Sequence, residues 1–156
     1  MPMRSRRIAL SCAAAVGAAA VVMPADAGRQ LVKFPERYAD GVHYATVNRG
    51  GIREEIFATP AAIEAAKTGQ PLPSGTVITM EDYRDGKLYR YIVLEKRAGW
   101  GAEYPPDQRN GEWEFQAFNA DKTVNEGENV ARCFSCHKSQ AAQDFVFTLD
   151  RMKNAK

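Results

Sequence analysis

Cysteine and histidine are scarce in this sequence, which holds three cysteines and two histidines among its 156 residues. Three cysteines are too few for the disulfide framework that holds many small secreted domains together. Repeats and low-complexity stretches are absent from the sequence. The composition, 45% hydrophobic and 26% charged, is typical of one ordinary globular domain and argues against collagen, long-range disorder and a polytopic membrane protein.

Long apolar runs are also missing, apart from one over residues 8–23. Its 16 residues fall short of the roughly 20 that a membrane-spanning helix needs. Three arginines precede this run and Ala25-Asp26-Ala27 follows it, which is the pattern of a cleaved secretory signal. We therefore predict a signal peptide over residues 1–27 and a periplasmic mature domain over residues 28–156. An uncleaved N-terminal anchor is the alternative reading of the same run.

An excess of one charge is absent from the predicted mature chain. Removal of residues 1–27 leaves 18 basic and 18 acidic residues, so the formal charge of +2 belongs to the full chain. No basic stripe or tail remains, and nothing in the sequence points to nucleic acid or an anionic membrane as a partner. The 129 residues that remain are enough to bury about two-thirds of the unfolded surface.

The segments that are present alternate between apolar and polar residues in the manner of strands. They are residues 42–49, 52–59, 75–83, 87–97 and 112–118, and residues 144–148 are expected to close the sheet. Asn48-Arg49-Gly50-Gly51 and Asp85-Gly86 are strong turn signals between neighbouring strands. In the strand at 112–118, Trp113, Phe115 and Ala117 are expected on the buried side.

The sequence predicts few helices. Thr59 followed by Pro60 predicts a helix start, and Gly69 predicts its end. A second short helix is expected from about Glu128 through the cysteines. The sequence thus predicts an α+β fold, mainly antiparallel β-sheet with two or three short helices.

The two cysteines outside the predicted signal fall in one string with a histidine, Cys133-Phe134-Ser135-Cys136-His137. CxxCH is the attachment motif of c-type haem, because two thiols add to the two haem vinyl groups and the next imidazole binds the iron. We predict one haem c held by Cys133 and Cys136, with His137 as the proximal iron ligand.

Other uses of this string have less support. A structural zinc site needs four ligands, and His43 is the only other imidazole in the sequence. A thioredoxin-like CxxC follows a strand of a parallel α/β unit, which the pattern does not contain. A plain Cys133–Cys136 disulfide in an exported protein remains as the alternative.

The position of the motif narrows the class of cytochrome, since only 19 residues follow His137. From about residue 37 to 150 the sequence resembles the cytochrome P-460 and cytochrome c′-β family. The strings that carry the resemblance are Ile52-Arg53, Pro60, Lys67-Thr68-Gly69, Gly75-Thr76-Val77 with Glu81, Trp113, and the tail CFSCHKSQAAQDFVFT.

The resemblance implies a compact sheet around one covalently attached haem c. Some members of the family oxidise hydroxylamine or nitric oxide, and others bind nitric oxide or carbon monoxide at a five-coordinate iron. The implied partners are a small gaseous or nitrogenous ligand and an electron-transfer protein. Members are often homodimers, so a second copy of the chain is a further candidate partner.

Oxidising members carry a lysine that cross-links to the porphyrin. Two residues separate it from Gly-Thr-Val, and this sequence has Met80 at that position. A thioether cannot form that amine cross-link. Met80 is either a core methionine beside the haem or a sixth, axial iron ligand, and His43 is a third option for that ligand. We expect a cytochrome that binds or redox-processes small ligands such as nitric oxide. The alternatives are a hydroxylamine or nitric oxide oxidoreductase and a six-coordinate electron carrier.

Residues around the haem are weaker predictions from the resemblance. Arg53 is a candidate partner of a propionate or a bound ligand, or else a surface partner of Glu55 or Glu81. Glu128 is a candidate distal base, or else an exposed residue at a helix N-terminus. Asp144 is expected to brace the segment after the motif. Three phenylalanines are candidates for the distal wall or for ordinary core, namely Phe57, Phe115 and Phe118.

Overall fold

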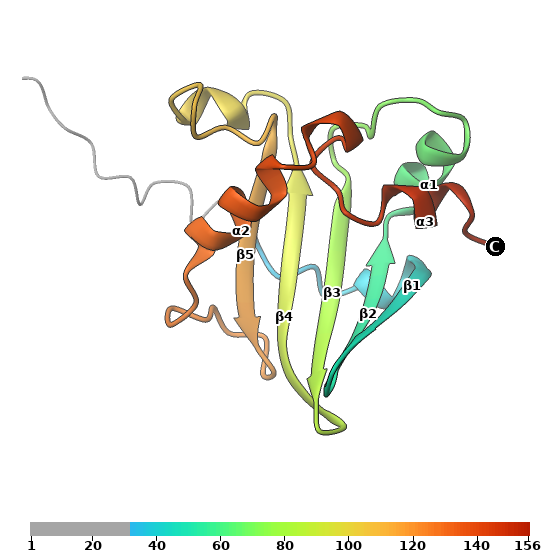
Figure 1. Cartoon of the computed structure of the whole chain (residues 1–156), viewed down its shortest axis with the longest axis vertical. Helices are drawn as coiled ribbons and strands as arrows, with labels where there is room; N and C mark the ends of the chain where they lie inside the picture. Colours follow the sequence, from blue (N-terminus) through green and yellow to red (C-terminus); the bar gives the residue numbers. More distant parts are fainter. Residues whose placement is uncertain (1–31) are drawn as a thin grey trace, which may run out of the picture.

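The computed structural model describes residues 32–156 and forms one five-stranded antiparallel sheet with the strand order β1-β2-β3-β4-β5. Three α-helices and several short 3-10 turns complete the fold (Figure 1). The predicted α+β class is therefore confirmed. The predicted signal over residues 1–27 lies outside the described residues and stays a prediction. Within residues 32–156, no helix is both long enough and apolar enough to cross a membrane.

The elements follow the predicted segments closely. The strands are β1 (Val42–Arg49), β2 (Ile52–Ala58), β3 (Val77–Arg84), β4 (Lys87–Lys96) and β5 (Trp113–Asn119). The α-helices are α1 (Pro60–Lys67), α2 (Val130–Lys138) and α3 (Leu149–Lys153). A 3-10 turn at Tyr38–Asp40 precedes β1, and another at Trp100–Glu103 lies in the long loop before β5.

The hairpin between β3 and β4 forms at the turn that the Asp85-Gly86 sequence predicts. Asp85 and Gly86 both have positive φ, 49° and 76°, which is the geometry of the tight turn whose twist matches that of the paired strands. Aspartate and glycine tolerate this conformation better than most residues. The turn fixes the register of the hairpin, in which Met80 pairs with Ile92 and Thr79 pairs with Val93.

One face of the sheet carries the main core. Strand alternation places Ile78, Ile92 and Phe115 on this face, where they join the cluster that α2 and α3 help to cover. Helix α2 lies across β5, and α3 packs beside β1 and α1 (Figure 1). We call this side the helix face of the sheet.

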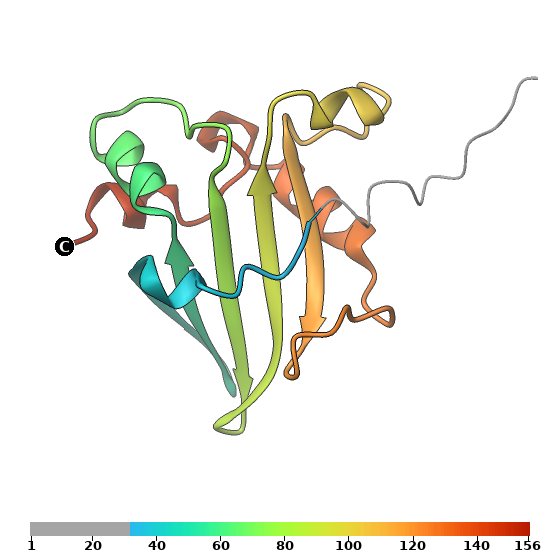
Figure 2. The ribbon, with the colours of Figure 1, turned by 180° about the vertical axis from the view of Figure 1, so that it is seen from behind.

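The opposite face is covered by the N-terminal part of the described chain. Residues 32–41 cross this side of the sheet (Figure 2), and Phe34 packs edge-on against Phe118 and Tyr91. We call this side the back face. Because α2 covers one face of β5 and the back-face segments cover the other, every residue from Trp113 to Phe118 is buried. The expected burial of Trp113, Phe115 and Ala117 is therefore confirmed, and Glu114 and Gln116 on the other side of the strand are buried as well.

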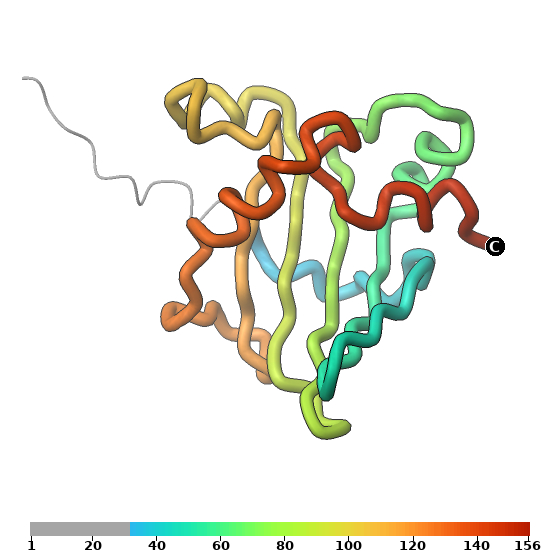
Figure 3. The backbone as a smooth tube through the Cα atoms, in the orientation of Figure 1, coloured from blue at the N-terminus to red at the C-terminus, as the bar shows by residue number. Residues whose placement is uncertain are grey.

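The prediction that residues 144–148 form a strand is also wrong. Asp144 and Phe145 have φ of 51° and 61°, in the left-handed region, so the chain turns sharply after the 3-10 turn at Ala141–Gln143. Figure 3 shows the backbone doubling back here between α2 and α3. The segment contains three consecutive apolar residues of high strand propensity, but the left-handed pair prevents an extended conformation. It serves as the link that brings the tail against α2.

Candidate functional site

Helix α2 carries the CxxCH string, and its sequence explains its start. Asn129 caps the helix, with its side chain accepting a hydrogen bond from the Ala131 N–H at 3.2 Å. Residues 133, 136 and 137 are spaced by one helical turn and therefore project from the same side of α2. Cys133 and Cys136 are both free thiols rather than a disulfide, and burial raises the pKa of Cys133.

His137 is held in one orientation. Its Nδ1 lies 2.6 Å from the carbonyl oxygen of Phe145, so Nδ1 carries the hydrogen and donates it. The rings of Phe115 and Phe147 lie against the imidazole, with centroids 4.8 and 5.0 Å away. Burial lowers the pKa of His137, which favours the neutral ring. The tautomer leaves a lone pair on Nε2, the form in which histidine binds a metal.

The carbonyl of Phe145 is placed by the residue before it. One oxygen of Asp144 accepts a hydrogen bond from Lys96 Nζ at 2.6 Å, and the other accepts one from Trp113 Nε1 at 3.2 Å. Lys96 and Trp113 end β4 and begin β5 and face each other in the ladder. Asp144 thus fastens the turn after α2 to the end of the sheet, in line with the predicted bracing role.

Replacement of Asp144 by alanine is expected to destabilise the protein by about 2–3 kcal/mol, since it leaves Lys96 without its carboxylate and puts alanine in the left-handed region. Asp144→Asn keeps the Trp113 bond and tolerates the backbone conformation, so it should cost less than half as much. Urea unfolding of both variants measures the difference. Equal losses, or none, would mean that Asp144 does not fasten the turn.

Met80 lies on the helix face, on the strand at the middle of the sheet. It pairs with Ile56 on β2 and Ile92 on β4, and its partly buried side chain packs against the same core cluster as Cys133. The structure therefore places Met80 and Cys133 on one side of the sheet. Whether Met80 is a core residue or an iron ligand stays a prediction for experiment.

Arg53 and His43 lie away from His137. Arg53 stacks over the ring of Tyr83 at 4.4 Å and binds Glu55 at 2.5 Å, and His43 Nε2 lies 2.7 Å from Glu55. In the register, Ile56 beside Met80 faces the helices, so residues 53 and 55 face the back. The structure does not bring these two candidates together with the CxxCH histidine.

Glu128 does approach the cysteine helix. It forms an ion pair with Arg90, whose Nε also donates to Asp82 at 2.9 Å. Asp82 is only 1% exposed, and the Arg84 guanidinium pairs with it at 3.2 Å. Sequence reasoning missed the partners of Glu128, because Asp82 and Arg90 are joined to it only by the pairing of β3 with β4 and the packing of α2. The carboxylate of Glu128 is thus part of a charged network rather than a lone exposed group.

The three phenylalanines predicted as wall residues separate in the structure. Phe115 lies under His137 on the helix face. Phe57 stacks with Tyr38 on the back face, and Phe118 belongs to the back-face cluster. Only Phe115 among the three contacts the candidate haem site.

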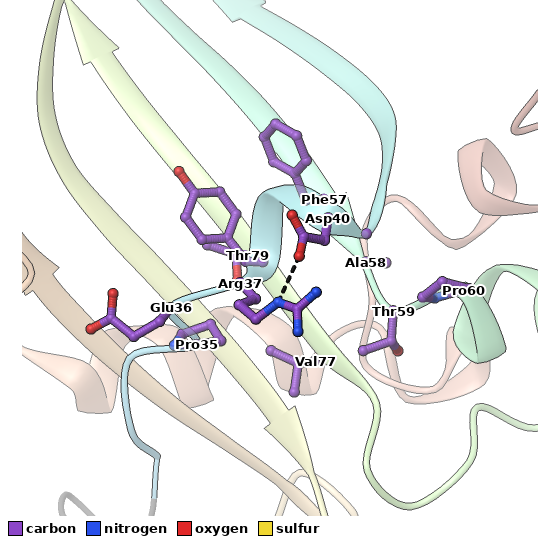
Figure 4. A pocket seen from close by; sticks show the side chains of 12 residues that line it. Pro35, Glu36, Arg37, Asp40, Phe57, Ala58, Thr59, Pro60, Val77 and Thr79 are labelled. Carbon is purple, nitrogen blue, oxygen red and sulfur yellow. Dashed lines mark hydrogen bonds and ion pairs between the residues drawn. The ribbon is translucent and has the colours of Figure 1, made fainter.

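A cavity of about 550 Å³ opens on the back face, between the 3-10 turn at Tyr38–Asp40 and strands β2 and β3. Figure 4 shows Val77, Thr79 and Phe57 on its walls and an ion pair of 2.7 Å between Arg37 and Asp40 beside it. The sheet separates this cavity from His137. It is therefore not part of the CxxCH site.

The residues present fit a haem c. Two free thiols project from one side of α2 with the spacing that two vinyl groups require, and the adjacent imidazole has its Nε2 lone pair fixed by the Phe145 carbonyl. The group would supply a redox-active iron, which His137 would bind through Nε2.

Comparison with known families supports the same reading. The model of the family described as cytochrome P460 matches residues 35–148, which is nearly three-quarters of the chain and includes every residue of the CxxCH string. No curated protein matches the sequence significantly.

Proposed function

Because the chain belongs to the cytochrome P460 family and is a haem-binding cytochrome, we propose that it carries one covalent haem c and binds or redox-processes small ligands such as nitric oxide. The signal pattern over residues 1–27 supports a periplasmic location. The observation that carries the proposal is the hydrogen bond of 2.6 Å between His137 Nδ1 and the Phe145 carbonyl, within a CxxCH string.

In this proposal the two cysteines and the histidine of the string each have a task. Cys133 and Cys136 anchor the group to α2, so it cannot dissociate. His137 offers Nε2 to the iron, while the Phe145 carbonyl holds the hydrogen on Nδ1 and sets the ring orientation. Phe115 excludes water from one side of the imidazole.

A vacant second coordination position is favoured by the chemistry of the helix face. Within the described residues, both histidines have assigned partners, His43 with Glu55 and His137 with Phe145. Met80 and its neighbours Ile56 and Ile92 give this part of the helix face an apolar character. Such a surface admits small neutral ligands such as nitric oxide or carbon monoxide.

The specific alternative is an electron carrier with His137 and Met80 as axial ligands. It is supported by the thioether of Met80, which lies on the same face as Cys133. A hydroxylamine or nitric oxide oxidoreductase has less support, since Met80 cannot form the lysine cross-link of the oxidising members. An electron-transfer partner and a homodimer remain proposals on the family resemblance alone.

Optical spectra of the matured protein are expected to show a high-spin ferrous iron that shifts on addition of carbon monoxide or nitric oxide. The reason is the vacant position opposite His137. The measurement is a spectrum of the ferric, reduced and gas-treated protein, repeated on Met80→Leu, which keeps the size of the side chain and removes its sulfur.

The variant separates the two readings. Under the ligand-binding proposal, Met80→Leu has the spectrum of the parent. A low-spin ferrous spectrum that ignores the gases, and that becomes high-spin in Met80→Leu, would establish the electron carrier instead. A strongly red-shifted Soret band of the reduced protein would indicate a modified porphyrin and would support the oxidoreductase function instead.

A further inference from the structure

A second cavity of about 410 Å³ lies on the side of α2 that faces away from the cysteines. Its helical wall is formed by two neighbouring rows of α2 residues at four-residue spacing, 130, 134 and 138 in one row and 131 and 135 in the other. Residues 133, 136 and 137 of the haem motif are absent from that wall. The cavity therefore lies on the other side of α2 from the three motif residues, although Phe115 both lines the cavity and contacts His137.

The wall of the cavity includes a buried carboxyl group, one oxygen of which has no hydrogen-bond partner. Glu114 on β5 lines the cavity and is only 1% exposed. Its Oε2 accepts a hydrogen bond from the Tyr104 hydroxyl at 2.9 Å, whereas Oε1 has no hydrogen-bond partner. Within residues 32–156, no cationic side chain pairs with this carboxyl group. An unpaired buried carboxylate is costly, so a donor that carries a positive charge would be bound favourably.

Three of the other residues on the cavity wall are aromatic, namely Tyr104, Phe115 and Phe134. The rings of Tyr104 and Phe134 lie 5.2 Å apart, and those of Phe134 and Phe115 lie 4.8 Å apart. Aromatic faces attract both flat apolar groups and cations. The cavity wall thus combines a carboxyl group that lacks one hydrogen-bond donor with several aromatic rings. A molecule that carries N–H donors on a flat apolar body is complementary to both.

We propose that the cavity behind α2 binds a small organic cation with N–H donors on a flat apolar body, with Glu114 as the anionic anchor. The cation donates to Oε1, while the Tyr104 hydroxyl continues to occupy Oε2. The aromatic rings cover the body of the ligand. The volume suits a molecule the size of a substituted benzene with one charged group.

The charges around Glu114 agree with a cationic ligand. Glu103 from the neighbouring 3-10 turn and Asp107 from the loop are acidic, and exposed Lys138 of α2 is the one cation on the cavity wall. On β4, Glu95 faces Glu114 in the register but is paired with Arg97. Burial raises the pKa of Glu114 to about 7, so cation binding displaces a proton and becomes tighter as the pH rises toward 8.

Isothermal titration of the holoprotein with benzamidine tests the proposal, and benzamide serves as the uncharged probe of the same shape. Neither probe needs the iron, so the outcome is independent of the sixth coordination position. We expect benzamidine to bind one to one and about tenfold more tightly at pH 8 than at pH 6, because a carboxyl group of pKa about 7 is about ten times more ionised at pH 8. Benzamide should bind at least tenfold more weakly than benzamidine.

Two variants locate the binding. Glu114→Gln removes the charge at constant shape and should weaken benzamidine binding at least tenfold. Glu95→Gln removes the neighbouring buried carboxylate and should leave the affinity unchanged. Absence of binding to the parent protein, or equal affinity of the parent and Glu114→Gln, would overturn the proposal.

Discussion

The double variant Cys133→Ser/Cys136→Ser is expected to retain no covalently attached haem after maturation. A serine hydroxyl cannot form the thioether bonds that hold haem c, and the structure offers no other thiol within residues 32–156. The measurement is haem staining of the denatured protein on a gel, with the absorption spectrum of the same preparation. The loss should be complete, which makes this one of the two largest effects we expect.

Ser135→Ala is the matched control, because residue 135 lies in the same helical turn and projects away from the cysteine side. This variant should stain like the parent protein. Undiminished staining of the double variant would contradict covalent attachment through Cys133 and Cys136. In that case the free thiols of α2 would need another explanation.

Local signals were sufficient for the strands and for the first helix. The turn at Asp85-Gly86, the alternation from Val77 to Tyr83 and the start at Pro60 each depend on residues close in sequence, and all three predictions are confirmed. Residues 144–148 also have strand-forming residues, Phe145, Val146 and Phe147, yet they turn. Their conformation depends on Asp144, which binds Lys96 and Trp113 far away in the sequence. Such tertiary contacts are invisible to a pattern of hydrophobicity.

The candidate site divides in the same way. The CxxCH string is contiguous, so its helix and the shared side of Cys133, Cys136 and His137 follow from the sequence alone. The partner of His137 does not, because it is a backbone carbonyl presented by a left-handed turn. For Arg53 the sequence left two roles open, and the structure shows the pairing with Glu55. Its side of the sheet follows from the pairing of Ile56 with Met80, which joins strands separated by a helix and a loop.

Burial on both faces of β5 explains why Glu114 was overlooked. The alternation of the strand predicted that Glu114 and Gln116 would face solvent, as polar residues opposite Trp113 and Phe115 usually do. The loop that contains Tyr104 covers Glu114 instead, and both residues are buried. Because this carboxyl group is buried, the stability of the protein should depend on pH through its protonation.

Glu114→Gln is expected to stabilise the protein at pH 8 by up to about 3 kcal/mol, and to have little effect at pH 5. The pKa of Glu114 is raised from the ordinary 4.5 to about 7, and 2.5 pH units correspond to about 3 kcal/mol. Between these values the folded protein holds a proton that the unfolded chain has released. The stability of the parent therefore falls as the pH rises from 4.5 to 7 and is constant above.

Urea unfolding of the parent and the variant at pH 5, 6, 7 and 8 measures this effect, because every other titrating group cancels in the difference. The matched control is Glu95→Gln, which breaks the pair with Arg97. It should destabilise the protein by a similar amount at each pH in this range. A difference for Glu114→Gln that does not change between pH 5 and 8 would show that the carboxyl group titrates at its ordinary pKa. In that case water must reach Oε1, and the cavity behind α2 would lack the dry anionic anchor that a bound cation requires.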